Sequence, residues 1–222
     1  MRLWHHVLDW LFPHKCILCS KVLERGETDL CSACRIDSPE CTDFSADYSF
    51  ISSWYAVWRY ENQVRESLLR YKFYGKRGYA HGYGRLLAMG LQARDMTDFD
   101  LLTYIPISKK RLRKRGFDQV RLLTQYTAGE LGMTYTDTLR KVRHNKPQSG
   151  IHGDAHRRAN VLGAYEVAEG VDLTGKRILL LDDIVTTGAT ASECARVLLT
   201  AGAKEVHLAV IATADHQNKT SR

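Results

Sequence analysis

The fold of this chain is decided by one stretch, Ile178-Leu179-Leu180-Leu181-Asp182-Asp183-Ile184-Val185-Thr186-Thr187-Gly188-Ala189-Thr190. Its four consecutive branched apolar residues predict a strand that is buried on both faces, as in the middle of a parallel sheet. Thr190 and Glu193 have the spacing of a capping box, which predicts a helix from about Thr190 to Gly202. Open α/β sheets bind ligands where such strands end. Two carboxylates and a turn rich in hydroxyl groups therefore stand on the predicted ligand side.

The turn after this strand is predicted to bind a phosphate group. A helix amino terminus collects unpaired N–H groups and partial positive charge, and small side chains let a phosphate approach closely. Residues 187–190 offer such a terminus. The turn lacks the lysine of a GxxxxGKS loop and the glycines of a GxGxxG loop, which argues against a nucleoside triphosphatase or a dinucleotide site. The pattern favours the monophosphate of a sugar.

Asp182 and Asp183 stand beside this turn, where they can accept hydrogen bonds from ribose hydroxyls. Neighbouring side chains on a strand point to opposite faces, so the end of the strand must bend for both to reach one sugar. The alternative is an aspartate pair that caps the next turn without binding a ligand. The pattern as a whole favours a sugar-phosphate site.

An apolar strand, two acidic residues and a TTGxT loop resemble the signature of the type I phosphoribosyltransferases. The resemblance implies that Asp182 and Asp183 hold the 2′- and 3′-hydroxyls of phosphoribosyl pyrophosphate. It also implies that the 5′-phosphate is held by Thr186, Thr187, Gly188, Ala189 and Thr190. In such an enzyme Mg²⁺ would bridge pyrophosphate and ribose oxygens, and the two aspartates would stabilise positive charge at C1. No segment of the sequence identifies the acceptor nucleophile.

Near the amino terminus, two CxxC pairs separated by eleven residues consist of Cys16, Cys19, Cys31 and Cys34. Such pairs can present four thiolates to one tetrahedral Zn²⁺ in a closed, structural site. A segment this short buries too little surface to fold unaided, so metal binding would supply its folding energy. A disulfide pair and a redox CxxC are the alternatives, and His14 or Cys41 are alternative ligands. Cys194 is interpreted as a small core residue.

The length and composition suit two parts of unequal size. A chain of 222 residues with 44% hydrophobic content suffices for one α/β domain, predicted at 46–222, and a small metal-binding appendage, predicted at 1–45. No stretch is long and apolar enough to span a membrane. Residues 3–12 predict a short amphipathic helix that packs on protein rather than on lipid. Cysteines in CxxC pairs without an export signal favour a reducing cytoplasm.

Strand and helix patterns alternate through the larger part. Further strands are expected at residues 54–60, 101–105 and 206–212. Helices are expected at 63–73 and 83–91, and a third is closed by Gly132. This order predicts an α/β fold with a mostly parallel sheet flanked by helices, of the type I phosphoribosyltransferase kind if the resemblance holds.

Positive charge is concentrated in two segments. Residues 109–121 contribute +6 and residues 140–158 contribute +5 to a formal net charge of +7, so the rest of the chain is acidic. Such concentration favours polyanion binding. We expect the first segment to be a loop that holds pyrophosphate through Lys109, Lys110 and Arg111. The second is expected to be a flap over the site, with an ordinary solvated loop as the alternative.

Further elements of the sequence resemble the ComF competence family. Residues 111–119, RLRKRGFDQ, resemble its RxRGFNQ element, with Asp118 in place of asparagine. Pro147-Gln148 and residues 157–165 resemble its PxQ and RRxNVxGAF elements. With the CxxC pairs, the resemblance covers nearly the whole chain. It implies a role in DNA uptake alongside a helicase-like translocase.

A second class of function is an adaptor that binds single-stranded DNA without turnover, because a fold does not settle function. The basic residues expected to contact DNA, or to belong to the flap, are Arg113, Arg115, Arg157 and Arg158. The aromatic residues interpreted as stacking platforms are Tyr71, Phe73, Tyr74 and Phe117. The sequence therefore supports a zinc-containing protein that binds phosphoribosyl pyrophosphate with Mg²⁺, or a DNA-binding partner of a competence helicase.

Overall fold

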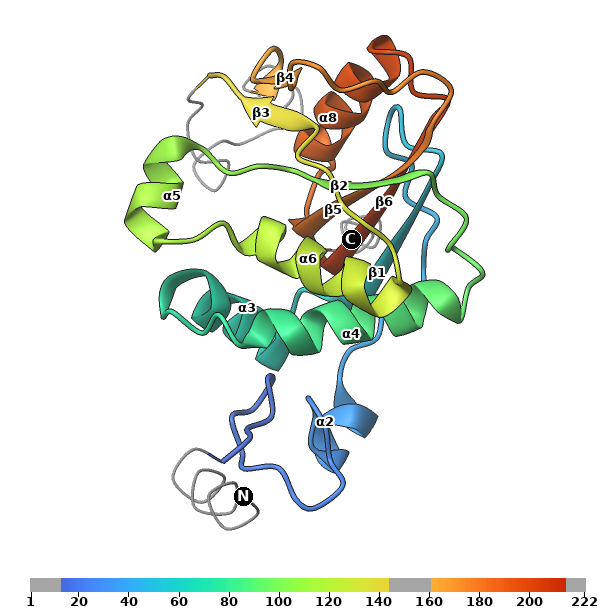
Figure 1. Cartoon of the computed structure of the whole chain (residues 1–222). Coiled ribbons are helices and arrows are strands. Elements are labelled where there is room, and N and C mark those ends of the chain that lie inside the picture. Colours follow the sequence, from blue (N-terminus) through green and yellow to red (C-terminus); the bar gives the residue numbers. More distant parts are fainter. Residues whose placement is uncertain (1–12, 144–160, 215–222) are drawn as a thin grey trace, which may run out of the picture.

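The computed structural model describes residues 13–143 and 161–214, and a parallel sheet lies at its centre (Figure 1). Within these ranges four strands pair in the order β1-β6-β5-β2, and every neighbouring pair is parallel. The strands are β1 (Ser53–Arg59), β2 (Leu101–Tyr104), β5 (Arg177–Val185) and β6 (Glu205–Thr213). The parallel sheet that the sequence predicts is confirmed.

Helices cover both faces of this sheet (Figure 1). One face carries α3 (Asn62–Phe73), α4 (Tyr79–Gln92) and α6 (Gln119–Leu131), and the other carries α8 (Ala189–Thr200). Leu179 and Leu181 of β5 join the core under the first three helices, whereas Ile178 and Leu180 join the core under α8. The apolar run is therefore buried on both faces, as predicted. Helix α4 starts four residues before the expected boundary.

A helix stands where the sequence was expected to form a basic loop. Helix α5 (Lys109–Arg115) has Ser108 as its N-cap, whose hydroxyl accepts a hydrogen bond from the amide of Arg111. Gly116 ends the helix with a positive φ of 75°. The loop prediction was wrong here because a serine N-cap and a glycine C-cap bracket seven residues that can form a helix.

A small antiparallel ribbon flanks the segment that the structure leaves undescribed. It consists of β3 (Leu139–Lys141) and β4 (Tyr165–Val167). The sequence patterns did not predict these strands, because three residues are too few to show an alternation. Residues 140 and 141 of the predicted flap belong to β3, whereas most of the flap, with Pro147, Arg157 and Arg158, lies outside the described residues. The predicted helix at 3–12 lies outside them too.

The segment that carries the CxxC pairs packs beneath α3 and α4 (Figure 1). It includes α2 (Ser32–Asp37), and its Ile17 and Leu18 belong to the same core cluster as Leu68 of α3. The carbonyl of Ile17 accepts a hydrogen bond from the hydroxyl of Ser67. The boundary expected at residue 45 stays a prediction, and buried side chains on its two sides share one core.

Candidate functional site

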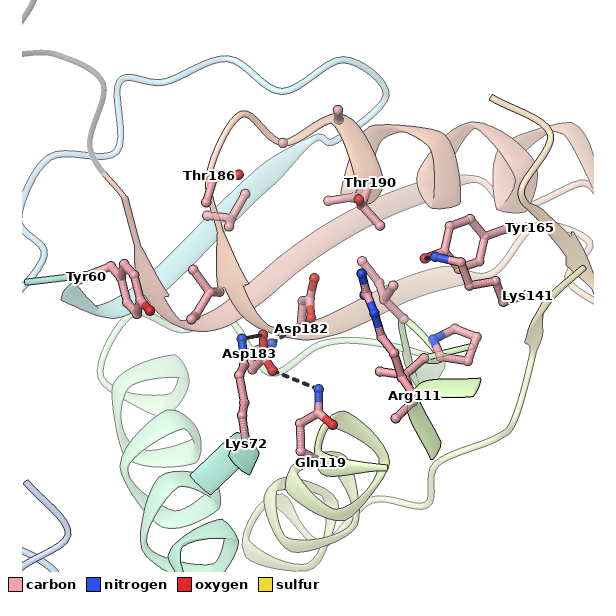
Figure 2. A pocket seen from close by; sticks show the side chains of 18 of the residues that line it. Tyr60, Lys72, Arg111, Gln119, Lys141, Tyr165, Asp182, Asp183, Thr186 and Thr190 are labelled. Atoms are coloured by element: carbon pink, nitrogen blue, oxygen red, sulfur yellow. Dashed lines mark hydrogen bonds and ion pairs between the residues drawn. The ribbon is translucent and has the colours of Figure 1, made fainter. Parts of the chain in front are cut away.

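A cavity of about 280 Å³ opens at the carboxyl ends of β2 and β5 (Figure 2). Its wall combines residues 182–186 and 188–191 with charged and polar side chains from five other elements. Those side chains are Lys72 of α3, Arg111 and Arg115 of α5, Gln119 of α6, Lys141 of β3 and Tyr165 of β4. The cavity is at the position that the parallel sheet predicts for a ligand.

The phosphate turn, residues 186–190, leads from β5 into α8. Gly188 is the N-cap of α8 with a φ of 71°, and a Cβ atom on it would lie 2.1 Å from Cδ1 of Tyr48. Glycine is therefore required both by the backbone conformation and by the contact with Tyr48. Because the first amides of a helix lack partners within the helix, the turn is suited to an anion.

The capping box predicted between Thr190 and Glu193 was wrong. Helix α8 begins at Ala189, and its N-cap makes no side-chain hydrogen bond. The carboxylate of Glu193 instead accepts a hydrogen bond from the amide of Gly163 at 2.7 Å and pairs with Arg196 at 2.8 Å. Glu193 thus ties the chain beyond the undescribed segment to α8 rather than capping the helix.

The acid pair, Asp182 and Asp183, lies at the end of β5 and points to opposite faces of the sheet. Asp183 lies towards α3 and α6, where Nζ of Lys72 is 2.8 Å from its Oδ1 and Nε2 of Gln119 donates to its Oδ2 at 3.1 Å. Oδ1 of Asp182 accepts a hydrogen bond from the amide of Asp183 at 2.8 Å. Both side chains nevertheless line the same cavity.

The two aspartates differ in electrostatic environment. Among the ion pairs of the described residues, Asp183 has a cation and Asp182 has none. Burial, followed by the charge of Asp183, raises the pKa of Asp182, and Lys72 only partly opposes this shift. Burial also lowers the pKa of Arg115, while Asp183 opposes that change. The cavity therefore holds an acidic side whose charge is incompletely compensated.

The opposite side of the cavity is cationic (Figure 2). Arg111 extends between the acid pair and Lys141, and Nζ of Lys141 donates to the hydroxyl of Tyr165 at 2.9 Å. Burial, followed by repulsion from Arg111, lowers the pKa of Lys141 to about 8. A bound anion would relieve this repulsion, so the side of Arg111 and Lys141 is suited to phosphate groups.

The structure brings together some of the residues expected to bind phosphates. Of the three expected to hold pyrophosphate, Arg111 lines the cavity, whereas Lys109 and Lys110 are exposed on α5. Thr187 lines a neighbouring pocket beside Tyr48, while the other four residues of the phosphate turn line the cavity itself.

Lys72, Gln119, Lys141 and Tyr165 were not predicted as site residues. One signal could have indicated Lys72, because it follows Val64 and Leu68 at intervals of four on the buried face of α3. A lysine on such an apolar stripe needs a partner. Lys141 and Tyr165 belong to strands that are too short to reveal which way their side chains point.

Asp118, the residue that replaces the asparagine of the ComF element, connects two elements of the site. Its Oδ1 accepts hydrogen bonds from the amides of Val120 and Arg121, which caps α6. Its Oδ2 accepts from the amide of Ile107 at 3.1 Å, in the turn after β2. The carboxylate therefore holds the turn that precedes α5 against the start of the helix that carries Gln119.

The residues expected to contact DNA divide into buried and exposed ones. Tyr71 is fully buried and its hydroxyl donates to the carbonyl of Gln119 at 2.6 Å, so its interpretation as a stacking platform was wrong. Phe73 and Tyr74 are exposed, and the guanidinium of Arg115 lies 4.9 Å from the ring centre of Phe73. Arg113 is exposed on α5. An exposed surface of arginine and aromatic side chains thus adjoins the cavity.

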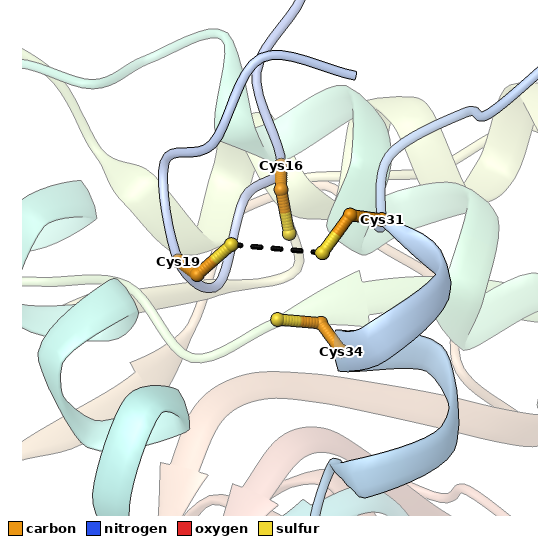
Figure 3. A group of neighbouring side chains, drawn as sticks. All are labelled: Cys16, Cys19, Cys31 and Cys34. Atoms are coloured by element: carbon orange, nitrogen blue, oxygen red, sulfur yellow. Dashed lines mark hydrogen bonds between the residues drawn. The ribbon is translucent and has the colours of Figure 1, made fainter. Parts of the chain in front are cut away.

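The four cysteines of the CxxC pairs converge in space (Figure 3). Their Sγ atoms, from Cys16, Cys19, Cys31 and Cys34, all lie within 4.8 Å of one another, and those of Cys19 and Cys31 are 3.6 Å apart. Four thiolates at about 2.3 Å from one Zn²⁺ would be roughly 3.8 Å apart, so the cluster fits this ion. No disulfide joins cysteines within the described ranges.

The alternative ligands do not join this cysteine cluster. Cys41 is buried in the core under α8, and His14 is exposed and lies outside the group. Burial, followed by hydrogen bonding with the neighbouring thiols, raises the pKa of Cys34 well above its usual range. A metal ion would displace the thiol protons and be coordinated by the sulfur atoms. The interpretation of Cys194 as a core residue is confirmed, because it is fully buried in α8.

Comparisons with known proteins agree with both parts of the structure. A phosphoribosyl transferase domain model matches residues 122–222, and a double zinc ribbon model matches residues 7–44. Competence protein ComFC of Streptococcus pneumoniae is 29% identical, over 86% of this chain and 96% of the relative. Competence protein F of Haemophilus influenzae is 24% identical, over 89% of this chain and 96% of the relative. The chain is a homologue of the ComF competence proteins.

This homology confirms the ComF resemblance, the phosphoribosyltransferase-type fold and the zinc-ribbon character of the amino-terminal segment. The double zinc ribbon match and the geometry of the cysteine cluster together support structural zinc. Among solved structures, the chain is similar to the glutamine phosphoribosylpyrophosphate amidotransferase from B. subtilis, with 22% identity and a TM-score of 0.42. That match covers 64% of this chain and 30% of the other. None of the helices in residues 13–143 and 161–214 is long and apolar enough to cross a bilayer.

Proposed function

We propose that the cavity of this ComF homologue binds phosphoribosyl pyrophosphate together with Mg²⁺. In this proposal the phosphate turn binds the 5′-phosphate, the acid pair accepts hydrogen bonds from the ribose hydroxyls, and Arg111 with Lys141 binds the pyrophosphate. One observation carries the proposal: a single cavity contains an acid pair, a helix amino terminus and a cationic side. A molecule with one ribose and phosphates at two ends matches that charge pattern.

The acid pair fits a hard divalent cation that arrives with a phosphate ligand. Carboxylate oxygens are suitable ligands for Mg²⁺, which commonly binds one or two carboxylates plus substrate phosphates. The ion would neutralise charge on the pyrophosphate leaving group. The side chains of Asp182 and Asp183 would hold the ribose and stabilise positive charge that develops at C1.

In a transfer reaction, the bond between C1 and pyrophosphate breaks and a nitrogen nucleophile forms the new bond to C1. Arg111 and Lys141 would stabilise the departing pyrophosphate. Because the relatives carry the names competence protein ComFC and competence protein F, we further propose that the chain acts in DNA uptake.

Calorimetric titration tests the binding proposal. Phosphoribosyl pyrophosphate with Mg²⁺ should bind the zinc-loaded wild type saturably, and binding should be lost in the folded double variant Asp182→Asn/Asp183→Asn. Arg113→Ala removes an exposed charge from α5 and serves as the control that keeps binding. Failure of the folded wild type to bind would overturn the proposal.

A second candidate function, single-stranded DNA binding beside a helicase-like translocase, is favoured by the exposed surface next to the cavity. There Arg115 stacks on Phe73, Arg77 stacks on Phe117 at 4.9 Å, and Tyr74 is exposed. Bases stack on aromatic and guanidinium planes with little sequence preference, while cations contact the phosphates.

Fluorescence anisotropy with an oligothymidine at several salt concentrations tests this second function. Arg113→Ala should weaken DNA binding and reduce the slope of log affinity against log salt by roughly 0.7, the value for one lost contact to a single strand. The same variant should still bind phosphoribosyl pyrophosphate. If neither Arg113→Ala nor Arg115→Ala changes the DNA affinity or its salt dependence, a DNA site on α5 would be contradicted.

A further inference from the structure

Lys72 of α3 places a positive charge against the acid pair of β5. It stands in the last turn of α3, and its Nζ lies 2.8 Å from Oδ1 of Asp183. The side chains of Lys72 and Asp183 are 16% and 7% exposed, so water screens this ion pair little. The ammonium group of Lys72 therefore limits which other groups can approach Asp183.

Gln119 engages the other oxygen of Asp183. An ionised carboxylate only accepts hydrogen bonds, so the amide nitrogen of Gln119 must face Oδ2, at 3.1 Å. This orientation leaves Oε1 of Gln119 without a hydrogen-bond partner among the described residues, although the residue is only 3% exposed. Both oxygens of Asp183 are thus occupied, and a buried acceptor on Gln119 is left unpaired beside them.

These contacts restrict metal binding in the absence of a ligand. Mg²⁺ requires near-octahedral oxygen coordination and usually obtains part of it from substrate phosphates. Asp182 is the carboxylate of the pair that has no cation in the described structure, and its Oδ1 already accepts the amide of Asp183. The ammonium group of Lys72 would also repel a divalent cation that approaches Asp183.

We propose that Lys72 is a positioning residue that keeps divalent metal off the acid pair until a pyrophosphate-bearing ligand supplies further oxygen ligands. The proposal rests on the proposed function, because it concerns the same site. It makes Lys72 responsible for the order of binding: metal enters with the ligand rather than before it. Removing the ammonium group frees Oδ1 of Asp183, which together with Asp182 and Oε1 of Gln119 then offers oxygen atoms to a metal ion alone.

The test is a titration with Mn²⁺ alone, without phosphoribosyl pyrophosphate, in which electron paramagnetic resonance reports the free ion. We expect Lys72→Met in the zinc-loaded full chain to bind Mn²⁺ at least tenfold more tightly than the wild type. Lys76→Met is the matched control, because it removes the same charge from an exposed position four residues further on. The control should bind Mn²⁺ like the wild type.

Two further variants assign the effect to the acid pair. Adding Asp183→Asn to Lys72→Met should abolish the gain, and Lys72→Gln provides a second neutral side chain if the methionine variant does not fold. Equal Mn²⁺ binding by the wild type and a folded neutral variant would overturn the proposal, as would a gain that persists without Asp183. Binding of phosphoribosyl pyrophosphate to the wild type is measured in a separate calorimetric titration. Absence of binding there would overturn the proposed function, and it would not change the Mn²⁺ affinities that test the role of Lys72.

Discussion

The cysteine cluster and the cavity are assembled in different ways. The cysteine cluster takes its side chains from one segment between Cys16 and Cys34, whereas the cavity is lined by residues that range from Tyr60 to Ala191. Short connections and four identical ligand types nearly determine a tetrahedral site. The charge pattern of the cavity instead depends on which helix faces meet the end of β5. Local spacing is therefore enough to predict a metal site, while a binding cavity requires the completed fold.

The largest expected effect is loss of the metal site. Cys34→Ser should lose zinc and lower the melting temperature by roughly 10 °C, because metal binding supplies several kcal/mol and Ile17 and Leu18 share the core of α3 and α4. Metal analysis should find about one zinc per chain in the wild type. Calorimetry and metal analysis of Cys41→Ser, a buried cysteine outside the cluster, provide the control. A Cys34→Ser protein with unchanged zinc and melting temperature would show that the two regions are independent.

Neutralising each aspartate of the acid pair should change the stability of the fold in opposite directions. Asp183→Asn leaves the ammonium group of Lys72 without its partner and should destabilise the fold by about 3 kcal/mol in urea unfolding. Asp182→Asn removes a buried carboxyl group whose ionisation is disfavoured by burial and by the charge of Asp183, so it should stabilise the fold near neutral pH, although it should weaken ligand binding. Destabilisation of similar size in both variants would show that the aspartates share one environment.

The stability of the wild type should therefore depend on pH through Asp182. Its pKa is raised in the folded state, so the folded protein keeps a proton that the unfolded chain releases. This contribution to stability is present below the ordinary carboxyl pKa of 3.8 and is lost as the pH rises towards the folded pKa. Between about pH 5 and about pH 8, the urea midpoint of Asp182→Asn should decline less than that of the wild type.

A smaller effect is expected at the phosphate turn. Gly188→Ala places a Cβ atom against Tyr48 and forces alanine into a positive φ, which should cost roughly 2 kcal/mol and abolish binding of phosphoribosyl pyrophosphate. Gly129→Ala is the matched control, because its Cβ would meet nothing within 4 Å in α6. Urea unfolding and calorimetry measure both quantities. Normal ligand affinity in Gly188→Ala would argue against the turn as the phosphate site.

The smallest effect is expected at Asp118. Asparagine keeps one acceptor for the cap of α6 but presents an amino group to the amide of Ile107, so Asp118→Asn should cost about 1 kcal/mol. Affinity for phosphoribosyl pyrophosphate should fall severalfold, because the turn before α5 positions Arg111. Arg121→Ala is the control, because it removes the exposed ion pair between Arg121 and Asp137 and leaves the carboxylate of Asp118 in place. An unchanged unfolding free energy would mean that the turn is held by other contacts.

The parts of the fold that were predictable are those with strong local signals. The run from Ile178 to Leu181 indicated a strand buried on both faces, and the glycine at position 132 marked the end of α6. Errors arose where two local signals competed. The serine before Lys109 and the glycine after Arg115 made a helix of an expected loop, and Glu193 found the amide of Gly163 instead of its own helix terminus.

The amino-acid sequence alone determined the α/β class, the cysteine cluster and the neighbourhood of the acid pair and the phosphate turn, because each depends on residues close together in the chain. Only the tertiary structure decided that Lys72 and Gln119 occupy Asp183, that Lys141 faces Arg111, and that Tyr71 is buried. The physical reason is that these contacts join separate elements of the chain: α3 and α6 meet β5 and each other, and β3 meets α5. Which side chains meet across such elements depends on the packing of whole helix faces, which no short sequence pattern encodes.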